Sequence, residues 1–376
     1  TVARGASLDF QVTAEDRDAT DSLTLEARVT GGTLSASQAG FTNLPASASG
    51  TSPRTVSVTG TAGAAAGTIE LTISVSDGNS GQASFTVTIT VTPPPDWRSA
   101  STSGPSARNL PAMAYDGARS HVVLFGGTSG GDETWIWNGT GWSQRTPATS
   151  PGSRWSHAMA YDAARQEVVL FGGFDGGFDG ETWVWNGTTW RQAATSGPAG
   201  RRDHALAYDP NRQVVVLFGG HANGNALRDT WEWNGTTWTD VTPTTGTPPD
   251  GRELGRMAYD PTTRRVLLHG GTPVNQASNI AGLVGWNGTA WSQLTASGPT
   301  RNNHILVTDT TRNRVILFGG WDGSELNETW EWDGSSWSQM SPMNPPPASA
   351  GSAAAYDATR NEVVLFDRNG NTYTYR

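Results

Sequence analysis

The sequence predicts an all-β protein in which a small β-sandwich of residues 1–92 precedes a six-bladed β-propeller of residues 96–376. Three observations support this fold class. Several segments of residues 1–92 alternate apolar and polar residues, as half-buried strands do. Three consecutive prolines at 93–95 interrupt any sheet. The rest of the chain repeats one unit six times, at intervals of 46 to 51 residues.

The alternation in the first part is clearest at 8–12, 23–25, 69–75 and 85–91. β-Branched residues fill these segments, and Gly-Gly, Asp-Gly and Ser-Gly dipeptides lie between them, as expected for strands joined by turns. About ninety residues of this kind suit a small β-sandwich. Residues 93–95 then predict a stiff hinge of about 3.1 Å per residue between two domains.

Each unit of the second part has the same order of motifs. An Arg precedes an Ala-Tyr-Asp turn, a strand ending Leu-Phe-Gly-Gly, a variable loop, Thr-Trp-x-Trp, an Asn-Gly hairpin and a final Trp. Four short strands per unit at this period indicate propeller blades. The last unit has only three strands, and residues 96–99 match the missing fourth, so we expect the ring to be closed by its N-terminal strand. The aligned strand ends are Phe125, Phe171, Phe218, His269, Phe318 and Phe366.

These motifs resemble kelch repeats over about 280 residues. The match rests on Arg-x-x-His, the Tyr-Asp turn, Phe-Gly-Gly, the late Trp and an acidic residue before Thr-Trp, which is Glu133, Glu181, Asp229 or Glu328. The resemblance implies a propeller whose role is usually binding, since a fold alone does not fix a function. Residues 14–18 and 75–79 resemble bacterial immunoglobulin-like or cadherin-like modules, which implies a secreted or cell-surface protein.

Composition excludes several classes of function. The chain has no Cys, so it lacks disulfides and thiolate metal ligands. Galactose oxidase, a well-known kelch enzyme, builds its cofactor from a Tyr cross-linked to Cys, so that copper-radical chemistry is absent here. The net charge of −9 without an Arg cluster argues against nucleic acid. No long apolar run or signal-like N-terminus is present, so we expect no transmembrane or targeting segment.

The repeat accounts for fifteen of the seventeen Trp residues, and Trp155 and Trp321 lie outside it. Both belong to loops that share one face of a kelch propeller, where variable loops usually carry function. We therefore predict a carbohydrate or extended-peptide site there, with Arg residues at the central mouth. The predicted ligand-binding residues are Trp155, Trp321, Phe174, Phe178, His221, Arg154, Arg201 and Arg301.

Each of these side chains also has a structural alternative. The Arg residues repeat in five blades, so they could pair with acidic residues or loop carbonyls instead of a ligand. Trp155 and Phe178 could fold back as loop anchors. His157, His204 and His304 follow the Arg residues by three positions, and symmetry spreads them around the ring, so we expect structural histidines and no metal cluster.

We expect a non-catalytic binding protein that needs no cofactor. One alternative is a structural subunit of a surface layer or filament, which self-associates. Another is a glycosidase or lyase at the propeller mouth, with Asp175, Asp179 and Asp322 as its carboxylates.

Acidic residues in the first domain suggest Ca²⁺ binding at one end of the sandwich. Carboxylate oxygens are the ligands that Ca²⁺ prefers. The candidate ligands are Asp16, Asp18, Asp21 and Asp77, and the alternative is a solvated acidic turn.

Overall fold

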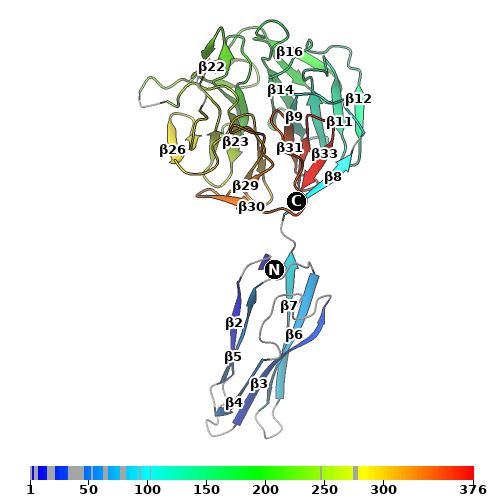
Figure 1. The fold of residues 1–376 in the computed structure, drawn as a ribbon, viewed down its shortest axis with the longest axis vertical. Helices are drawn as coiled ribbons and strands as arrows, with labels where there is room; N and C mark the ends of the chain where they lie inside the picture. Colours follow the sequence, from blue (N-terminus) through cyan, green and yellow to red (C-terminus); the bar gives the residue numbers. More distant parts are fainter. Residues whose placement is uncertain are drawn as a thin grey trace. The chain divides into compact units, whose positions relative to one another are not determined.

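The computed structural model describes residues 95–376 except 102, 246–247 and 274–277, and within residues 1–94 it describes seven strands. The chain forms two compact units, Thr1–Pro95 and Asp96–Arg376 (Figure 1). All the regular elements in the described part of the chain are strands. None of the described residues belongs to a helix with the length and apolar character to cross a membrane.

The first unit contains two sheets. A five-stranded sheet has the order β1-β7-β6-β3-β4, and β2 pairs with β5 in a separate two-stranded sheet. The alternating segments 8–12, 23–25, 69–75 and 85–91 all lie within these strands. The sandwich remains a prediction, and the Ca²⁺ candidates Asp16, Asp18, Asp21 and Asp77 lie outside the described residues. The strands are β1 (Val2–Ala3), β2 (Ser7–Ala14), β3 (Ser22–Gly32), β4 (Ala46–Thr51), β5 (Arg54–Thr61), β6 (Gly67–Ser76) and β7 (Gln82–Thr92).

The second unit is a six-bladed β-propeller, as predicted, with four antiparallel strands in each blade. Blade 1 consists of β9 (Ala112–Asp116), β10 (His121–Phe125), β11 (Thr134–Trp137) and β12 (Trp142–Arg145). Blade 2 consists of β13 (Ala158–Asp162), β14 (Glu167–Phe171), β15 (Thr182–Trp185) and β16 (Trp190–Ala194). Blade 3 consists of β17 (Ala205–Asp209), β18 (Val214–Phe218), β21 (Thr230–Trp233) and β22 (Trp238–Asp240).

The other three blades repeat this arrangement. Blade 4 consists of β23 (Arg256–Asp260), β24 (Arg265–His269), β25 (Leu283–Trp286) and β26 (Trp291–Thr295). Blade 5 consists of β27 (Ile305–Asp309), β28 (Arg314–Phe318), β29 (Thr329–Trp332) and β30 (Trp337–Met340). Blade 6 consists of β31 (Ala353–Asp357), β32 (Glu362–Phe366), β33 (Thr372–Tyr375) and β8 (Trp97–Ser101).

The ring closes as predicted, because β8 supplies the fourth strand of blade 6. Trp97 pairs with Tyr375 in an antiparallel register. The Asp96 amide donates to the Arg376 carbonyl at 2.9 Å. The first strand of the unit therefore joins its last strand, and no blade is left with an unpaired third strand.

The repeated Trp residues join neighbouring blades. In five of the six blades, the Trp that begins the fourth strand donates from Nε1 to the Thr that begins the third strand of the adjacent blade. This bond is 2.9 Å between Trp190 and Thr134 and 2.8 Å between Trp238 and Thr182. It recurs at Trp97, Trp142 and Trp291. Blade 4 breaks the series, since Leu283 replaces the Thr and Trp337 Nε1 has no partner among the described residues.

Candidate functional site

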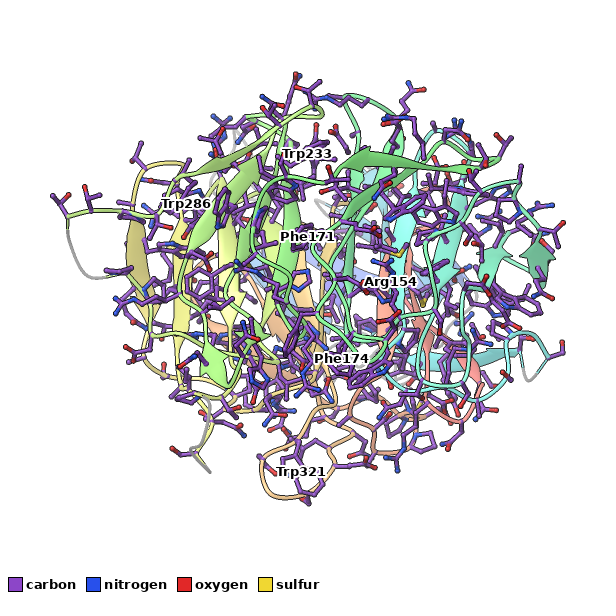
Figure 2. The ribbon with its side chains drawn as sticks, turned by 90° about the horizontal axis from the view of Figure 1, so that it is seen from above. Arg154, Phe171, Phe174, Trp233, Trp286 and Trp321 are labelled. Carbon is purple, nitrogen blue, oxygen red and sulfur yellow. The ribbon has the colours of Figure 1, made fainter. Side chains whose placement is uncertain are left out.

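The loops that follow the Gly pairs all lie at one end of the propeller, which we call the loop face. There, in blades 2 to 5, the residue after the Gly pair bridges to the residue that follows the repeated Arg. The bridged pairs are Trp155 with Phe174, Arg202 with His221, Glu253 with Thr272, and Asn302 with Trp321. In Figure 2, Phe174 and Trp321 lie toward this end, and Trp233, beside a hairpin turn, lies toward the other. The two off-register Trp residues therefore share a face.

The repeated Arg residues do not form an open ring at the mouth. Arg154, Arg201 and Arg301 are 1 to 3% exposed. Each donates to the carbonyl of the first Gly of the following Gly pair, at 2.9 to 3.0 Å. Each also pairs with the acidic residue before Thr-Trp, which is Glu181 at 3.2 Å, Asp229 at 2.6 Å or Glu328 at 2.5 Å. The predicted ligand-binding role is corrected here, because these guanidinium groups already bind the blade.

The repeated histidines are structural as well. His157 and His204 are 6% and 3% exposed, and each ring packs edge-on against the Phe of the preceding blade, at 5.6 Å from Phe125 and 5.4 Å from Phe171. Burial lowers the pKa of His204 to about 3 and that of His157 well below its usual value. The described residues contain no group of three or more His, Asp or Glu that could hold a metal ion.

Four of the predicted site residues form one cluster on blades 2 and 3. Ring centroids are 5.3 Å apart for Trp155 and Phe174, 5.3 Å for Phe174 and Phe178, and 5.8 Å for Phe178 and His221. The guanidinium of Arg202 lies over both Trp155 and Phe174, at 5.4 and 5.5 Å from the ring centroids. This arrangement anchors the loops and presents one mixed aromatic and cationic surface.

Charged groups extend this cluster toward the propeller axis. His221 Nδ1 lies 3.2 Å from Arg202 Nη2 and 3.2 Å from Glu253 Oε2. Arg202 also pairs with Asp203 at 3.3 Å. Burial raises the pKa of Glu253 above its usual value, and the nearby Asp203 adds to this effect. Sequence reasoning missed Arg202 and Glu253, although each stands next to a repeated Arg.

Trp321 lies on blade 5, apart from the cluster, and is 44% exposed. Its backbone is bridged to Asn302, and Asn279 Nδ2 donates to its carbonyl at 2.8 Å. Asn302 Nδ2 in turn donates to Asn279 Oδ1 at 2.7 Å. A loop of blade 4 thus supports the backbone of this Trp while its indole remains open to solvent.

A closed circle of backbone hydrogen bonds surrounds the axis beneath the loop face. Each blade contributes the residue two positions after its Arg, or after Ser349 in blade 6. The amide of each donates to the carbonyl of the one before, at 2.9 to 3.1 Å, and the last bond closes the circle. Every member has a positive φ, between 53° and 78°. The members are Leu110, Ser156, Asp203, Leu254, Asn303 and Gly351. We call this circle the axial ring.

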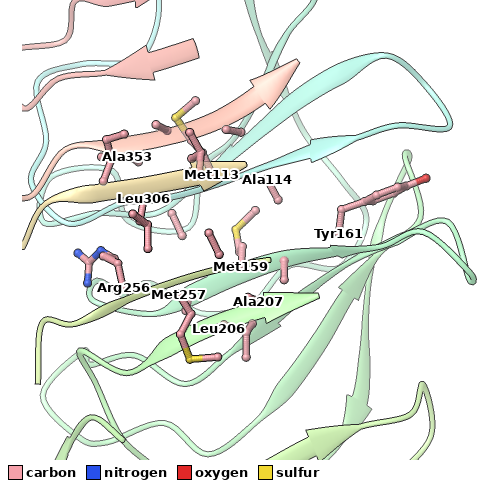
Figure 3. Close-up of a pocket in the computed structure, with 18 of the residues that line it drawn as sticks. Met113, Ala114, Met159, Tyr161, Leu206, Ala207, Arg256, Met257, Leu306 and Ala353 are labelled. Atoms are coloured by element: carbon pink, nitrogen blue, oxygen red, sulfur yellow. The ribbon is translucent and has the colours of Figure 1, made fainter. Parts of the chain in front are cut away.

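Below the axial ring, the first strands of the six blades enclose a cavity of about 420 Å³ around the propeller axis. Its wall is mostly apolar, with Met113, Met159, Met257, Leu206 and Leu306 among alanines (Figure 3). Arg256 lies toward the loop-face end and Tyr161 toward the other end. Sequence reasoning missed this cavity. The available signal was Arg256 itself, which stands where the other blades have Ala112, Ala158, Ala205, Ile305 and Ala353.

The carboxylates considered for catalysis lie on two different blades, and one of them is paired with an Arg. Asp179 lies 3.5 Å from Arg154, and burial raises its pKa above the usual value. Asp175 is exposed in its turn, where its Oδ1 accepts from the Gly177 amide at 3.4 Å. Asp322 is exposed on blade 5, whereas the other two lie on blade 2.

Comparison with known proteins agrees with the architecture. A family model described as the KLHDC2/KLHL20/DRC7 Kelch-repeats domain matches residues 178–366, just over half of the chain. The match runs from the loop of blade 2 to the second strand of blade 6. No curated protein matches the chain. Together with the repeated Arg, Tyr-Asp, Gly-Gly and Trp positions, the family match indicates a binding, protein-interaction role, and the chain belongs to the Kelch-repeat family.

Proposed function

We propose that this protein is a non-catalytic, secreted or cell-surface binding protein that holds an extended polymer across its loop face. The polymer is an extended peptide or a polysaccharide. The observation that carries the proposal is the gathering of Trp155, Phe174, Phe178 and His221 into one cluster, with the exposed Trp321 on the same face. Aromatic side chains with adjacent polar groups suit both ligand classes.

The two parts of this face have different roles in the proposal. Arg202 covers the rings of Trp155 and Phe174, so the cluster offers a rigid edge and fixed charges. The indole of Trp321 is the open surface on which a sugar ring or a peptide side chain can stack. A polymer that contacts both must extend from blades 2 and 3 to blade 5, which favours an extended ligand over a small one.

The secreted or cell-surface location rests on the sequence of the first domain, which resembles bacterial immunoglobulin-like or cadherin-like modules. Fractionation of the source cells, with detection of the protein by antibody, tests this part separately. Recovery from the cytosol alone would contradict it without affecting the binding site.

Binding is tested with a glycan array and a peptide library screened with the whole chain. We expect Trp321→Ala to weaken the best ligand about tenfold, because it removes the exposed stacking surface. Trp155→Ala should also weaken binding, through loss of the cluster. Arg191→Ala, on the outer strand of blade 2, is the control and should bind normally, since its side chain is 60% exposed there. If both Trp variants bind as the wild type does, the proposed site is wrong.

A further inference from the structure

Blade 4 contains an Arg that the repeat does not explain. In the aligned positions the other blades have Ala or Ile, but blade 4 places Arg256 at the start of its first strand, in the wall of the axial cavity. A charged side chain in this wall must be stabilised by partners, since transferring a charge away from water is costly. The partners of Arg256 therefore indicate whether its role is structural or ligand binding.

The described residues give Arg256 hydrogen bonds but no carboxylate. Nη1 donates to the Gly255 carbonyl at 3.1 Å, and Nη2 donates to Asn303 Oδ1 at 3.0 Å. No ion pair found in the described part of the chain includes Arg256. Burial lowers the pKa of Arg256 below the usual value for a guanidinium, and the charge of Asp203 offsets only part of this effect.

Asp203 is the acidic residue whose charge acts on Arg256. Its carboxylate already forms an ion pair with another Arg. It is 8% exposed and lies 3.3 Å from Arg202 Nε, with which it forms an ion pair. Burial raises the pKa of Asp203 above its usual value, and the charge of Arg202 offsets only part of this effect. Asp203 and Ser156 both line the cavity at the end where Arg256 lies. This end therefore combines a cation without a paired anion and several hydrogen-bonding groups.

The rest of the cavity has the opposite character. Met113, Met159, Met257, Leu206 and Leu306 line it among alanines, and none of them needs a polar partner. Methionine adapts to ligands of irregular shape because its side chain is flexible and polarisable. A volume of about 420 Å³ falls within the range of small-molecule sites. A cavity with one polar end and an apolar wall matches a ligand that has a polar headgroup and an apolar chain.

We infer that the axial cavity binds a small amphipathic carboxylate, such as a medium-chain fatty acid, with its carboxylate on Arg256 and its alkyl chain along the methionine and alanine wall. Arg favours this headgroup because its planar fork matches a carboxylate in two hydrogen bonds. This site is separate from the loop-face site and does not depend on the ligand proposed for that face.

The probe is decanoate, titrated into the whole chain below its micelle concentration and followed by calorimetry. We expect saturable binding with one site per chain. Octanoate should bind more weakly and dodecanoate more tightly, by about fourfold for each methylene group, until the chain no longer fits. Acetate should bind far more weakly than any of them, because it offers only the headgroup.

Arg256→Ala tests the headgroup contact. Alanine stands at this position in four other blades, so the variant should fold, which circular dichroism and thermal unfolding would show. We expect decanoate affinity to fall about tenfold to a hundredfold in Arg256→Ala, and less in Arg256→Lys. Arg264→Gln, at the opposite end of the same strand pair, removes one charge and is the matched control that should leave affinity unchanged.

Three results would overturn the inference. One is the absence of saturable binding for every chain length in the folded wild type. The second is equal affinity of Arg256→Ala and the wild type for decanoate, and the third is equal affinity of the wild type for decanoate and decyltrimethylammonium. Either equality would mean that only the apolar wall contributes. Because the test does not use the loop face, failure here would leave the result for Trp321→Ala intact.

Discussion

Blade 4 differs from the other blades in the way its buried polar groups are paired. In blades 1, 2, 3 and 5 the repeated Arg pairs with an acidic residue of the same blade. Blade 4 keeps Arg252 but has Gly282 in the acidic position, and no ion pair in the described residues includes Arg252. Burial lowers the pKa of Arg252 to about 10. The same blade also introduces Arg256, His269 and Leu283.

This difference shows how a repeat separates structural from functional residues. A polar side chain present in most blades stabilises every blade in the same way, and its partners are found within the repeat. A polar side chain present in one blade has no repeated partner. Of the blade 4 changes, Arg256 lines the axial cavity and Gly282 ends the loop that supports Trp321, so two of them lie at the proposed sites.

The largest difference is expected between Arg201→Met and Arg252→Met. Removing Arg201 leaves Asp229, whose pKa Arg201 lowers despite its burial, without its guanidinium partner. We expect a loss of about 3 kcal/mol in the free energy of unfolding. Arg252→Met leaves no carboxylate behind and should cost about 1 kcal/mol. Urea unfolding of both variants measures the difference, and equal losses would show that the two blades are not distinguished by pairing.

The next effect concerns His269, which replaces the Phe of the other blades. Burial lowers the pKa of His269 to about 3, whereas an unfolded His titrates near 6.5. Below pH 6.5 the unfolded chain therefore binds a proton that the folded chain does not, and stability is lost as the pH falls toward 3. At pH 5 this cost is about 2 kcal/mol.

The change in the free energy of unfolding caused by His269→Phe should therefore be about 2 kcal/mol more favourable at pH 5 than at pH 8. The comparison between the two pH values cancels the constant cost of losing the hydrogen bond between His269 and His304, which is 3.1 Å long. Unfolding of both proteins at both pH values gives the measurement. A difference between variant and wild type that does not change with pH would contradict the assignment of a neutral, buried His269.

A smaller effect is expected where blades meet. Trp238 Nε1 donates to Thr182, whereas Trp337 Nε1 faces a blade with Leu283 in place of Thr. Replacing Trp by Phe removes a similar ring area at both positions, but it removes a hydrogen bond only at Trp238. We expect Trp238→Phe to cost about 1 kcal/mol more than Trp337→Phe in urea unfolding. If Trp337→Phe lowers stability as much as Trp238→Phe or more, then Trp337 Nε1 has a hydrogen-bond partner equivalent to the missing Thr.

The smallest effect is expected at Asn279, in the loop of blade 4. Asn279→Ala removes its bonds to Trp321 and Asn302, which lie near the surface. Stability should change by about 0.5 kcal/mol or less, because surface substitutions rarely cost more. Ligand binding on the loop face should nevertheless weaken, since Trp321 loses its support. A large loss of stability without loss of binding would reverse the roles assigned to this loop.

Much of the propeller could be predicted because its signals repeat. The period, the hairpin turns and the match of residues 96–99 to a missing fourth strand depend on local patterns that occur in every blade. The gathering of Trp155, Phe174, Phe178 and His221 follows from loop positions that the repeat defines. The repeat predicts Arg154, Arg201 and Arg301 at the mouth, but the direction of their side chains depends on acidic partners about 27 residues away, which only the folded blade brings into contact.

The axial ring and the cavity could not be read from local patterns. Leu110 and Leu254 have φ values of 57° and 59°, in a conformation for which Leu has no preference. The hydrogen bonds of the ring join residues of different blades and impose this conformation from outside each segment. The cavity wall likewise depends on six strands meeting at one axis. Only the substitution of Arg256 for Ala gave a sequence signal for it.

The axial ring has a consequence for where this chain can begin and end. Its six donors and six acceptors are used up within the circle, and the segments that carry them are continuous loops. The first and last strands of the propeller, β8 and β33, lie elsewhere and pair with each other. A circular permutant that joins Arg376 to Asp96 through a short linker and opens the hairpin at 186–187 would therefore keep all six bonds. Its blades would be numbered differently along the chain, while the centre of the molecule stayed the same.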